Sequence, residues 1–379
     1  MGDLSNPMKM VQSASRVVIK VGTRILTTQK NELDQRRIEK LAEEIVRLRK
    51  EGRQVILVSS GAIGAGLGLL GWAARPKELA KSQAAAAVGQ GRLMQVYAEK
   101  FGCYGVRVAQ ILLTRDDMAQ RNRYLNARQT MKVLLQEGVL PVVNENDTVS
   151  VDEIRFGDND ELSVQVAQLM DAQLLVILTD VDGFEFRPAT GPRELIPLVE
   201  RITPELERSA GGAGQPTSTG GMVSKIKAAK TATACGIPML LANGTREGIL
   251  ETLLIEGKLT GTLFLPSGKR RIESRKRWLA FTGRPVGSVQ VDAGAREALL
   301  LKGKSLLASG IRKIEGGFKK GDLVSVRDES GEEFARGLVN YPSGDLTRIR
   351  GMRSDEISSV LGQKAQEAIH RDFMVILKD

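Results

Sequence analysis

Short apolar runs rich in β-branched residues alternate with helix-patterned segments from residue 16 to about residue 245. Between the first two runs, Ile38, Leu41, Ile45 and Leu48 recur at helical spacing, with charged residues on the other side. This βαβ succession predicts an α/β fold with an open, mostly parallel sheet sandwiched by helices. Such sheets bind ligands beyond the carboxyl ends of their strands, so the residues that follow each run are the first candidates for a site. The predicted strands span 16–21, 54–59, 106–113, 139–143 and 174–178, and further predicted helices span 82–98 and 163–171.

The alternating pattern stops near Pro266, where lysine and arginine crowd a short segment that ends at Trp278. Beyond it, short alternating stretches are punctuated by many glycines, which is typical of a small twisted sheet or barrel. We therefore expect two domains. The predicted segments are an α/β domain over 1–265, a basic linker over 266–282, a small β-barrel over 283–362 and a C-terminal tail over 363–379.

Composition excludes several classes of function. The chain has one histidine, His370, near its C-terminus, which leaves no histidine-based triad or acid–base pair for the α/β domain. Cys103 and Cys235 stand alone, so we expect a reducing compartment, the cytoplasm, and no structural metal. No apolar run approaches the ~20 residues of a membrane helix. The net charge of +10 makes an acidic partner plausible, such as a nucleotide or RNA.

Two glycine motifs resemble nucleotide-binding loops without meeting their requirements. The G-x-G-x-x-G of 66–71 begins seven residues after the predicted strand end, and no acidic residue follows a second strand ~20 positions on. Gly303-Lys304-Ser305 matches the end of a phosphate-binding P-loop, but Ala298 stands where the upstream glycine is required. Any ATP site is therefore built in another way.

Two of the predicted strands end in residues suited to binding anions. Lys20 lies within an apolar strand and is followed by Gly22, so its ammonium group can meet a phosphate that the backbone approaches closely. Ser60 and Gly61 begin a turn before a predicted helix, where backbone N–H groups and the serine hydroxyl can contact substrate oxygens. The structural alternatives are an edge-strand lysine that reaches solvent and a serine that only caps a helix.

Two polar clusters follow the strand that ends at Val143. Asp147 of the first can bind a substrate ammonium group, and Asn159 of the second a carboxylate. Asp158 or Asp160 can orient the lysines or help to hold Mg²⁺, and we give Asp160 as the metal candidate. The structural alternative is a surface loop rich in Asn and Asp.

A fourth set of residues suits a nucleotide. Thr179 and Asp180 end the predicted strand that begins at Leu174, as expected for the rim of a base or ribose site. The segment 219–225 places glycines before a predicted helix N-terminus and a lysine one turn inside, which favours phosphate binding through amides, dipole and ammonium. An ordinary glycine-rich loop is the alternative. The candidates in this segment are Thr219, Gly220, Gly221, Met222, Val223, Ser224 and Lys225.

Together these residues indicate phosphoryl transfer to a carboxylate. A carboxylate is already ionised at neutral pH, so it needs no general base to act as the acceptor. The reaction needs alignment of two anions and neutralisation of charge on the transferred group, which lysines, amides and Mg²⁺ supply.

Seven ordered motifs resemble those of the glutamate 5-kinase family, a branch of the amino acid kinase superfamily, over nearly the whole chain. Their order and spacing make a chance match negligible. They are Ile19-Lys20-Val21-Gly22-Thr23, Ser60-Gly61-Ala62-Ile63, Leu125-Asn126-Ala127-Arg128, Asn144-Glu145-Asn146-Asp147, Gly157-Asp158-Asn159-Asp160, Leu178-Thr179-Asp180 and Thr219-Gly220-Gly221-Met222.

This resemblance implies ATP-dependent phosphorylation of the side-chain carboxylate of L-glutamate to L-glutamyl 5-phosphate, the first step of proline biosynthesis, with proline as a feedback inhibitor. It further implies a homo-oligomer, a dimer or tetramer, and hand-off of the product to glutamyl phosphate reductase. Lys20 and Lys225 would stabilise the transition state, with Asp158 positioning them. ATP would contact Lys20, Gly22, Thr179, Asp180 and the loop 219–225, and glutamate would contact Ser60, Gly61, Asp147 and Asn159.

The C-terminal part resembles a PUA domain, through Val291-Asp292, Gly303-Lys304-Ser305 and Gly310-Ile311 among other positions. Acidic and basic residues are about equally frequent between Val286 and Val360, so we expect a structural or regulatory role and not RNA binding. The family's pattern is not kept after Gly183 or in 211–218, which leaves the adenine contacts open. Alternative functions are a superfamily kinase for another small acid, or an RNA-binding protein with a vestigial kinase domain.

Overall fold

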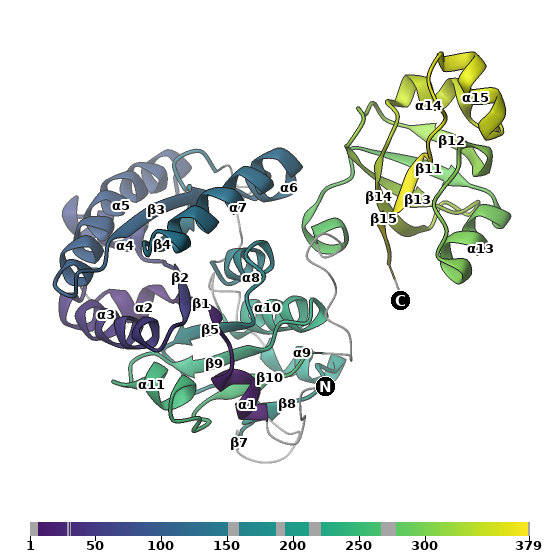
Figure 1. Ribbon diagram of the computed structural model, residues 1–379. Coiled ribbons are helices and arrows are strands. Elements are labelled where there is room, and N and C mark those ends of the chain that lie inside the picture. Colours follow the sequence, from purple (N-terminus) through teal and green to yellow (C-terminus); the bar gives the residue numbers. More distant parts are fainter. Residues whose placement is uncertain are drawn as a thin grey trace. The chain divides into compact units, whose positions relative to one another are not determined.

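The computed structural model describes residues 7–28, 30, 32–150, 159–186, 194–211, 221–266 and 278–377 (Figure 1). The chain divides into two compact units. Unit 1 comprises Met1–Asp117 and Arg123–Arg271, and unit 2 comprises Met118–Asn122 and Ile272–Asp379. Each unit has its own hydrophobic core.

Helices and strands alternate along residues 7–266, as the sequence predicts. The five predicted strands and three predicted helices are all present, with ends that differ from the prediction by a few residues. The helices are α1 (Pro7–Gln12), α2 (Thr23–Leu26), α3 (Gln35–Lys50), α4 (Ala62–Leu69), α5 (Leu79–Gly102), α6 (Arg115–Ala119), α7 (Arg121–Gln136), α8 (Asn159–Leu169), α9 (Pro204–Ala210), α10 (Met222–Ala234) and α11 (Ile249–Leu254). The strands are β1 (Arg16–Val21), β2 (Gln54–Val58), β3 (Val108–Leu113), β4 (Leu140–Glu145), β5 (Leu174–Thr179), β6 (Glu185–Phe186), β7 (Glu194–Leu195), β8 (Leu198–Val199), β9 (Met239–Asn243) and β10 (Thr262–Phe264).

Eight of these strands form the main sheet, in the order β3-β4-β2-β1-β5-β9-β10-β8. Its recorded pairs are parallel except for β9 with β10, which confirms the predicted mostly parallel sheet. Strand β3 lies at the edge of the sheet and is only partly buried, unlike the central strands. The carboxyl ends of β1, β2, β4 and β5 lie at one edge of the sheet because these strands are parallel neighbours.

Helices pack on both faces of the sheet. The inward-facing residues Val17, Ile19 and Val21 of β1 join a core that includes buried residues of α3, α5 and α11. Since side chains alternate between the two faces of a strand, Val18 and Lys20 point to the opposite face. Helices α8 and α10 pack against each other, and α8 also packs against β1 and β5 (Figure 1). Lys20 therefore lies beneath α8, and a lysine in a central strand has no route to solvent along the sheet.

Two glycines allow α4 and α5 to pack in close contact. A Cβ atom on Gly89 of α5 would lie 1.8 Å from the carbonyl oxygen of Ala62, and one on Gly66 of α4 would lie 1.8 Å from that of Ala85. Neither approach is possible for a residue with a side chain. Gly66, the first glycine of the G-x-G-x-x-G motif, is therefore needed for helix packing, and the motif does not form a dinucleotide loop.

Unit 2 contains a five-stranded sheet, in which the strands follow the order β12 (Ile311–Glu315), β11 (Gly287–Val291), β13 (Leu323–Arg327), β14 (Glu333–Val339) and β15 (Ile369–Ile376). We expected residues 363–379 to form a tail. Instead, Ile369–Ile376 of this segment form strand β15, which pairs with β14. The other described elements of unit 2 are the π-helical turn Trp278–Thr282, α13 (Ala293–Lys302), the 3₁₀ turn Ala308–Gly310, α14 (Ser343–Ile349) and α15 (Ser354–Leu361).

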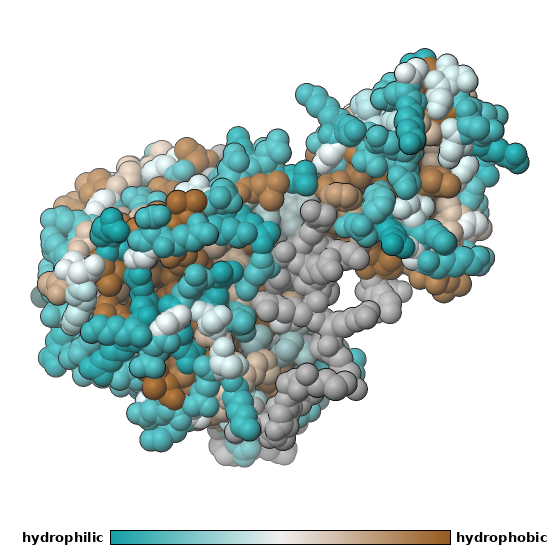
Figure 2. All heavy atoms as spheres, in the orientation of Figure 1, coloured by the Kyte–Doolittle hydropathy of each residue, from teal (hydrophilic) through white to brown (hydrophobic). Residues whose placement is uncertain are grey.

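Hydrophilic side chains cover most of the face shown in Figure 2, with scattered hydrophobic ones between them. Leu69, Val88 and Leu301 are among the exposed hydrophobic residues. Among the described residues, no helix is both long enough and apolar enough to span a membrane.

Candidate active site

One buried carboxylate joins the two lysines that the sequence singles out. Lys20 Nζ lies 2.6 Å from Oδ1 of Asp160, and Lys225 Nζ lies 3.1 Å from Oδ2 of the same residue. Lys20, Lys225 and Asp160 are 3%, 5% and 0% exposed. Ser224 also donates its hydroxyl to Oδ2 of Asp160, at 2.9 Å. Both ammonium groups are thus held at one place at the carboxyl edge of the sheet.

Three separate elements bring this cluster together. Lys20 lies near the end of β1, Asp160 is the second residue of α8, and Lys225 is in the first turn of α10. The prediction that a lysine lies one turn inside a helix after glycine is confirmed, because α10 begins at Met222 with Gly221 as its N-cap. The family resemblance implied that Asp158 positions the lysines, with Asp160 as a metal candidate, but Asp160 contacts both ammonium groups. Asp158 lies outside the described residues.

The first turn of α10 has the form that phosphate binding requires. Gly221 precedes the helix in an extended conformation, without a side chain that caps the first N–H groups. Met222 and Ser224 are partly exposed and Val223 is exposed, whereas Lys225 is buried. Helix N-termini of this kind favour anions through free amides and the helix dipole. Thr219 and Gly220, the other candidates in this loop, lie outside the described residues.

A second polar group lies where β2 and β4 end. Asn159, the first residue of α8, donates its side-chain amide to the backbone oxygen of Ser59 at 2.7 Å, to Oγ of Ser60 at 3.0 Å and to Oδ1 of Asn144 at 2.9 Å. Asn144 in turn donates to Oε1 of Gln90 on α5, at 2.8 Å. The structure therefore brings the candidates Ser60 and Asn159 into direct contact.

The turn after β2 has the expected conformation. Gly61 has φ of 94°, a left-handed conformation that residues with a side chain rarely adopt, and it is the N-cap of α4. Asp147 is half-buried in the turn after β4, and Asn146 next to it donates its backbone N–H to the carbonyl of Leu113. Both segments lie at the carboxyl edge of the sheet, as predicted.

The candidates for nucleotide contact lie at the end of β5. Gly22 donates its backbone N–H to the carbonyl of Leu178, so the end of β1 lies beside the end of β5. Asp180 accepts hydrogen bonds from Arg24 at 2.7 Å and from Thr179 at 3.2 Å. Partial burial raises the pKa of Asp180, but the hydrogen bond and charge of Arg24 outweigh this effect and lower the pKa below its ordinary value.

The described residues contain no cluster of three or more Asp, Glu, His or Cys side chains that could hold a metal ion. Asp160, our metal candidate, has a lysine ammonium against each of its two oxygens. A cation at the same oxygens would face two like charges at short range. The described donor set therefore does not fit a metal held by protein side chains alone, and the position of Asp160 suits the orientation of the lysines.

The residues behind the site were not predicted from the sequence. Gln90 and Tyr97 are buried on α5, and Tyr97 shares a 2.8 Å hydrogen bond with the hydroxyl of Ser59. Arg24 was missed because it pairs with Asp180 across 156 positions of sequence. The sequence does contain one signal for Gln90, a break in the apolar pattern of its helix. Gln90 lies on the same helical stripe as the small or apolar residues Ala86, Leu93 and Tyr97, where a polar residue is out of pattern.

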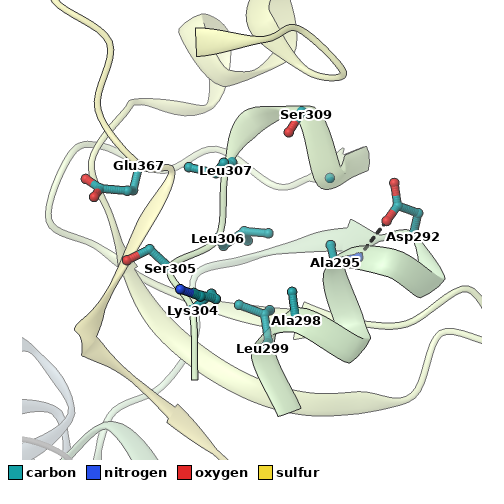
Figure 3. A pocket seen from close by; sticks show the side chains of 11 residues that line it. Asp292, Ala295, Ala298, Leu299, Lys304, Ser305, Leu306, Leu307, Ser309 and Glu367 are labelled. Atoms are coloured by element: carbon teal, nitrogen blue, oxygen red, sulfur yellow. Dashed lines mark hydrogen bonds between the residues drawn. The ribbon is translucent and has the colours of Figure 1, made fainter. Parts of the chain in front are cut away.

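Unit 2 has a separate pocket of about 530 Å³, formed partly by the P-loop-like sequence (Figure 3). Gly303 ends α13 in a left-handed conformation, so Lys304 and Ser305 follow a helix, whereas a P-loop precedes one. Asp292, which lines the pocket, accepts the backbone N–H of Ala295 and so caps α13, and it also pairs with Arg312. The prediction that this motif is not a P-loop is confirmed.

Comparison with known proteins agrees with the geometry of both units. The Amino acid kinase family matches residues 15–243, and the PUA domain matches residues 287–361. A glutamate 5-kinase of Moorella thermoacetica is 50% identical over 370 residues, which are 97% of this chain and 97% of that protein. A glutamate 5-kinase of Geobacter metallireducens is 53% identical over 371 residues, 97% of this chain and 99% of that protein.

Solved structures include carbamate kinase from Giardia lamblia bound to AMP-PNP. It is 19% identical and has a TM-score of 0.49 over 68% of this chain and 100% of that chain. The sequence relatives are far more similar and extend over both units, so the resemblance found in the ordered motifs is confirmed. The chain belongs to the amino acid kinase family and, within it, to the glutamate 5-kinases.

Proposed function

We propose that this chain transfers the γ-phosphoryl group of ATP to the side-chain carboxylate of L-glutamate and so forms L-glutamyl 5-phosphate. The observation that carries the proposal is the convergence of Lys20 and Lys225 on the buried carboxylate of Asp160. Two relatives named glutamate 5-kinase, 50% and 53% identical over 97% of this chain, support glutamate as the acceptor.

The phosphate end of the site is formed by β1, β5 and α10. Lys20 and Lys225 neutralise the charge that spreads over the transferred group, and Asp160 holds both ammonium groups in place. Gly22 lets the backbone approach the phosphates, while the amides of Gly221, Met222 and Val223 receive them at the start of α10. Thr179 and Asp180, with Thr219 and Gly220, complete the ATP contacts in this proposal.

The glutamate end is formed by the turns after β2 and β4 and by the start of α8. Ser60, Gly61, Asp147 and Asn159 hold the substrate, and Asp147 meets its ammonium group. The glutamate carboxylate is ionised at neutral pH, so it attacks the γ-phosphorus without loss of a proton. This explains how the chain can work with a single histidine, His370, which lies in β15 of unit 2.

A divalent ion accompanies ATP in kinases of this kind, and we propose Mg²⁺. The ion would be held by ATP and not by Asp160, because both oxygens of Asp160 face lysine ammonium groups. The ion supplies charge neutralisation when bound. Within the protein, alignment of donor and acceptor rests on the lysines, amides and Asp160.

We also propose the finer properties that the family resemblance implies. These are a place at the first step of proline biosynthesis, feedback inhibition by proline, a dimeric or tetrameric assembly and hand-off of the labile acyl phosphate to glutamyl phosphate reductase. A cytoplasmic location agrees with two isolated cysteines, of which Cys235 is buried. The PUA domain is proposed to be structural or regulatory.

The test is ATP turnover with glutamate and Mg²⁺, with hydroxylamine present to trap the acyl phosphate as a hydroxamate. Hydroxamate formation that depends on all three components supports the proposal. L-Aspartate and N-acetyl-L-glutamate are tested at equal concentrations, and faster turnover of either would replace glutamate as the substrate. Tight, salt-sensitive RNA binding without hydroxamate formation would instead favour an RNA-binding protein.

A further inference from the structure

Three amide side chains form a continuous chain of hydrogen bonds behind the proposed glutamate residues. Gln90 of α5 accepts from Asn144 at the end of β4, and Asn144 accepts from Asn159 at the start of α8. Asn159 then contacts Ser60. Gln90 and Asn144 are 9% and 3% exposed, so both lie behind the site and away from solvent.

Backbone groups fix the orientation of the Asn159 and Asn144 amides, and Asn144 then fixes that of Gln90. The side-chain nitrogen of Asn159 faces the backbone oxygen of Ser59 at 2.7 Å, and only the NH₂ group can donate there. Oδ1 of Asn144 accepts from the backbone N–H of Glu145 at 2.9 Å, so its NH₂ group must face Gln90. Gln90 consequently presents Oε1 to Asn144.

This orientation makes glutamine a costly residue at position 90. Its Nε2 atom is buried and has no hydrogen-bond partner among the described residues. A buried donor without a partner destabilises the folded state, whereas an apolar side chain of similar size would not. The hydrogen bond that Gln90 does make goes to Asn144, and this bond is the reason we find for glutamine here.

We propose that Gln90 is a positioning residue for the glutamate site, acting through Asn144 on Asn159 and Ser60. This inference rests on the proposed function. By accepting from Asn144, Gln90 holds the Oδ1 atom of Asn144 toward Asn159 and so keeps the Asn159 amide in a single orientation. The close contact of α5 with the start of α4, which Gly89 permits, brings Gln90 to this position.

The same network sets which hydrogen-bonding groups Ser60 and Asn159 offer to a substrate. The NH₂ group of Asn159 is already shared among three acceptors, which leaves its Oδ1 atom to accept a hydrogen bond. Oγ of Ser60 accepts from Asn159, so the hydroxyl hydrogen of Ser60 is left to donate. Asn159 thus suits the ammonium group of an amino acid, not the carboxylate that sequence analysis expected, and Ser60 suits the carboxylate.

The experiment compares three variants of the full chain in the hydroxamate assay. Gln90→Leu removes the acceptor for Asn144, whereas Gln90→Glu keeps an acceptor oxygen at that position and replaces the unpartnered nitrogen with a second carboxylate oxygen. Gln95→Leu is the matched control, because Gln95 lies on the same helix, is exposed and bonds only to Arg92 and Glu99 among the described residues. The KM for glutamate, the KM for ATP and the melting temperature are measured for each.

We expect Gln90→Leu to raise the KM for glutamate about tenfold, with the KM for ATP changed by less than about twofold. Gln90→Glu should recover at least half of this change on a logarithmic scale, and Gln95→Leu should match the wild type. An unchanged KM for glutamate in Gln90→Leu would overturn the inference, as would equal increases in both KM values.

A double-mutant cycle with Asn144→Leu tests whether Gln90 acts through Asn144. Leucine at this position removes both the donor to Gln90 and the acceptor for Asn159, so adding Gln90→Leu should raise the KM for glutamate no further. Independent, multiplicative effects would overturn the proposed route. If Gln90→Leu does not fold, the two single variants Gln90→Glu and Asn144→Leu still decide the question, because the proposal requires Gln90→Glu to bind glutamate more tightly than Asn144→Leu. Absence of glutamate turnover in the wild type would refute the proposed function itself.

Discussion

Lys20 Nζ lies 2.6 Å from Oδ1 of Asp160, and both side chains are almost completely withdrawn from solvent. Lys225 approaches the other oxygen of the same carboxylate from a different helix. Burial of an ammonium group is strongly unfavourable without an opposite charge close by. Asp160 therefore stabilises the folded position of both lysines, and in our proposal it also sets their geometry for the phosphoryl group.

Asp160→Asn tests both effects, because asparagine has nearly the same shape but no charge. We expect kcat to fall at least about 100-fold and the free energy of unfolding to fall by about 3–5 kcal/mol. Kinetics with trapped hydroxamate and denaturant titration measure the two quantities. Glu161→Gln is the control, since Glu161 is the next residue of α8 and its pair with Arg115 is only partly buried. Similar losses in both variants would contradict the special role of Asp160.

Lys225→Met should slow turnover far more than it weakens glutamate binding. Methionine keeps the buried hydrocarbon chain but removes the ammonium group that faces the transferred phosphoryl group in our proposal. We expect kcat to fall by about 10²–10³, with the KM for glutamate changed by less than about threefold. Lys230→Met on the same helix is the control, because Lys230 forms an exposed pair with Glu207. An unchanged kcat in Lys225→Met would remove the transition-state role.

Sequence alone predicted the elements of unit 1 well because their signals are local. The apolar run around Lys20 and the helical spacing of Ile38, Leu41, Ile45 and Leu48 depend on neighbours within a few positions. Parallel pairing then places the strand ends at one edge, which is why Lys20, Ser60 and Asp147 were all predicted near a common site.

The contacts within the site could not be predicted in the same way. The resemblance implied Asp158 as the residue that positions the lysines and left Asp160 as a metal candidate, whereas Asp160, the second residue of α8, is the one found against Lys20. Gln90 joins Asn144 across 54 positions, a contact that depends on how α5 packs against α4. Such long-range pairing leaves no periodic signal in a single sequence.

Tyr97 should make the protein less stable at high pH. Burial raises the pKa of its hydroxyl above the ordinary value of 10.0, although the hydrogen bond with Ser59 lowers it in part. Above pH 10 the unfolded chain loses this proton while the folded chain keeps it. The stabilisation is thus complete below pH 10 and is lost as the pH rises, by up to about 1.4 kcal/mol per pH unit.

Tyr97→Phe isolates this contribution. At pH 7 the variant should be less stable by about 1 kcal/mol, because the hydrogen bond with Ser59 is lost. Above pH 10 its free energy of unfolding should fall less steeply than that of the wild type, so the two curves converge. Urea titrations between pH 7 and 11 measure the slopes, and parallel curves would contradict a raised pKa for Tyr97.

Gly89 and Gly91 offer a matched pair on α5 that separates helix packing from helix propensity. Gly91→Ala meets no atom within 4 Å and should stabilise the protein by up to about 1 kcal/mol, because alanine favours helix. Gly89→Ala would place a methyl group 1.8 Å from the carbonyl oxygen of Ala62, so α5 must move away from α4. We expect a loss of about 1–3 kcal/mol. Because that movement also shifts Gln90 relative to Asn144, the KM for glutamate should rise in Gly89→Ala and stay unchanged in Gly91→Ala; equal stabilities of the two variants would show that the close helix contact does not exist in solution.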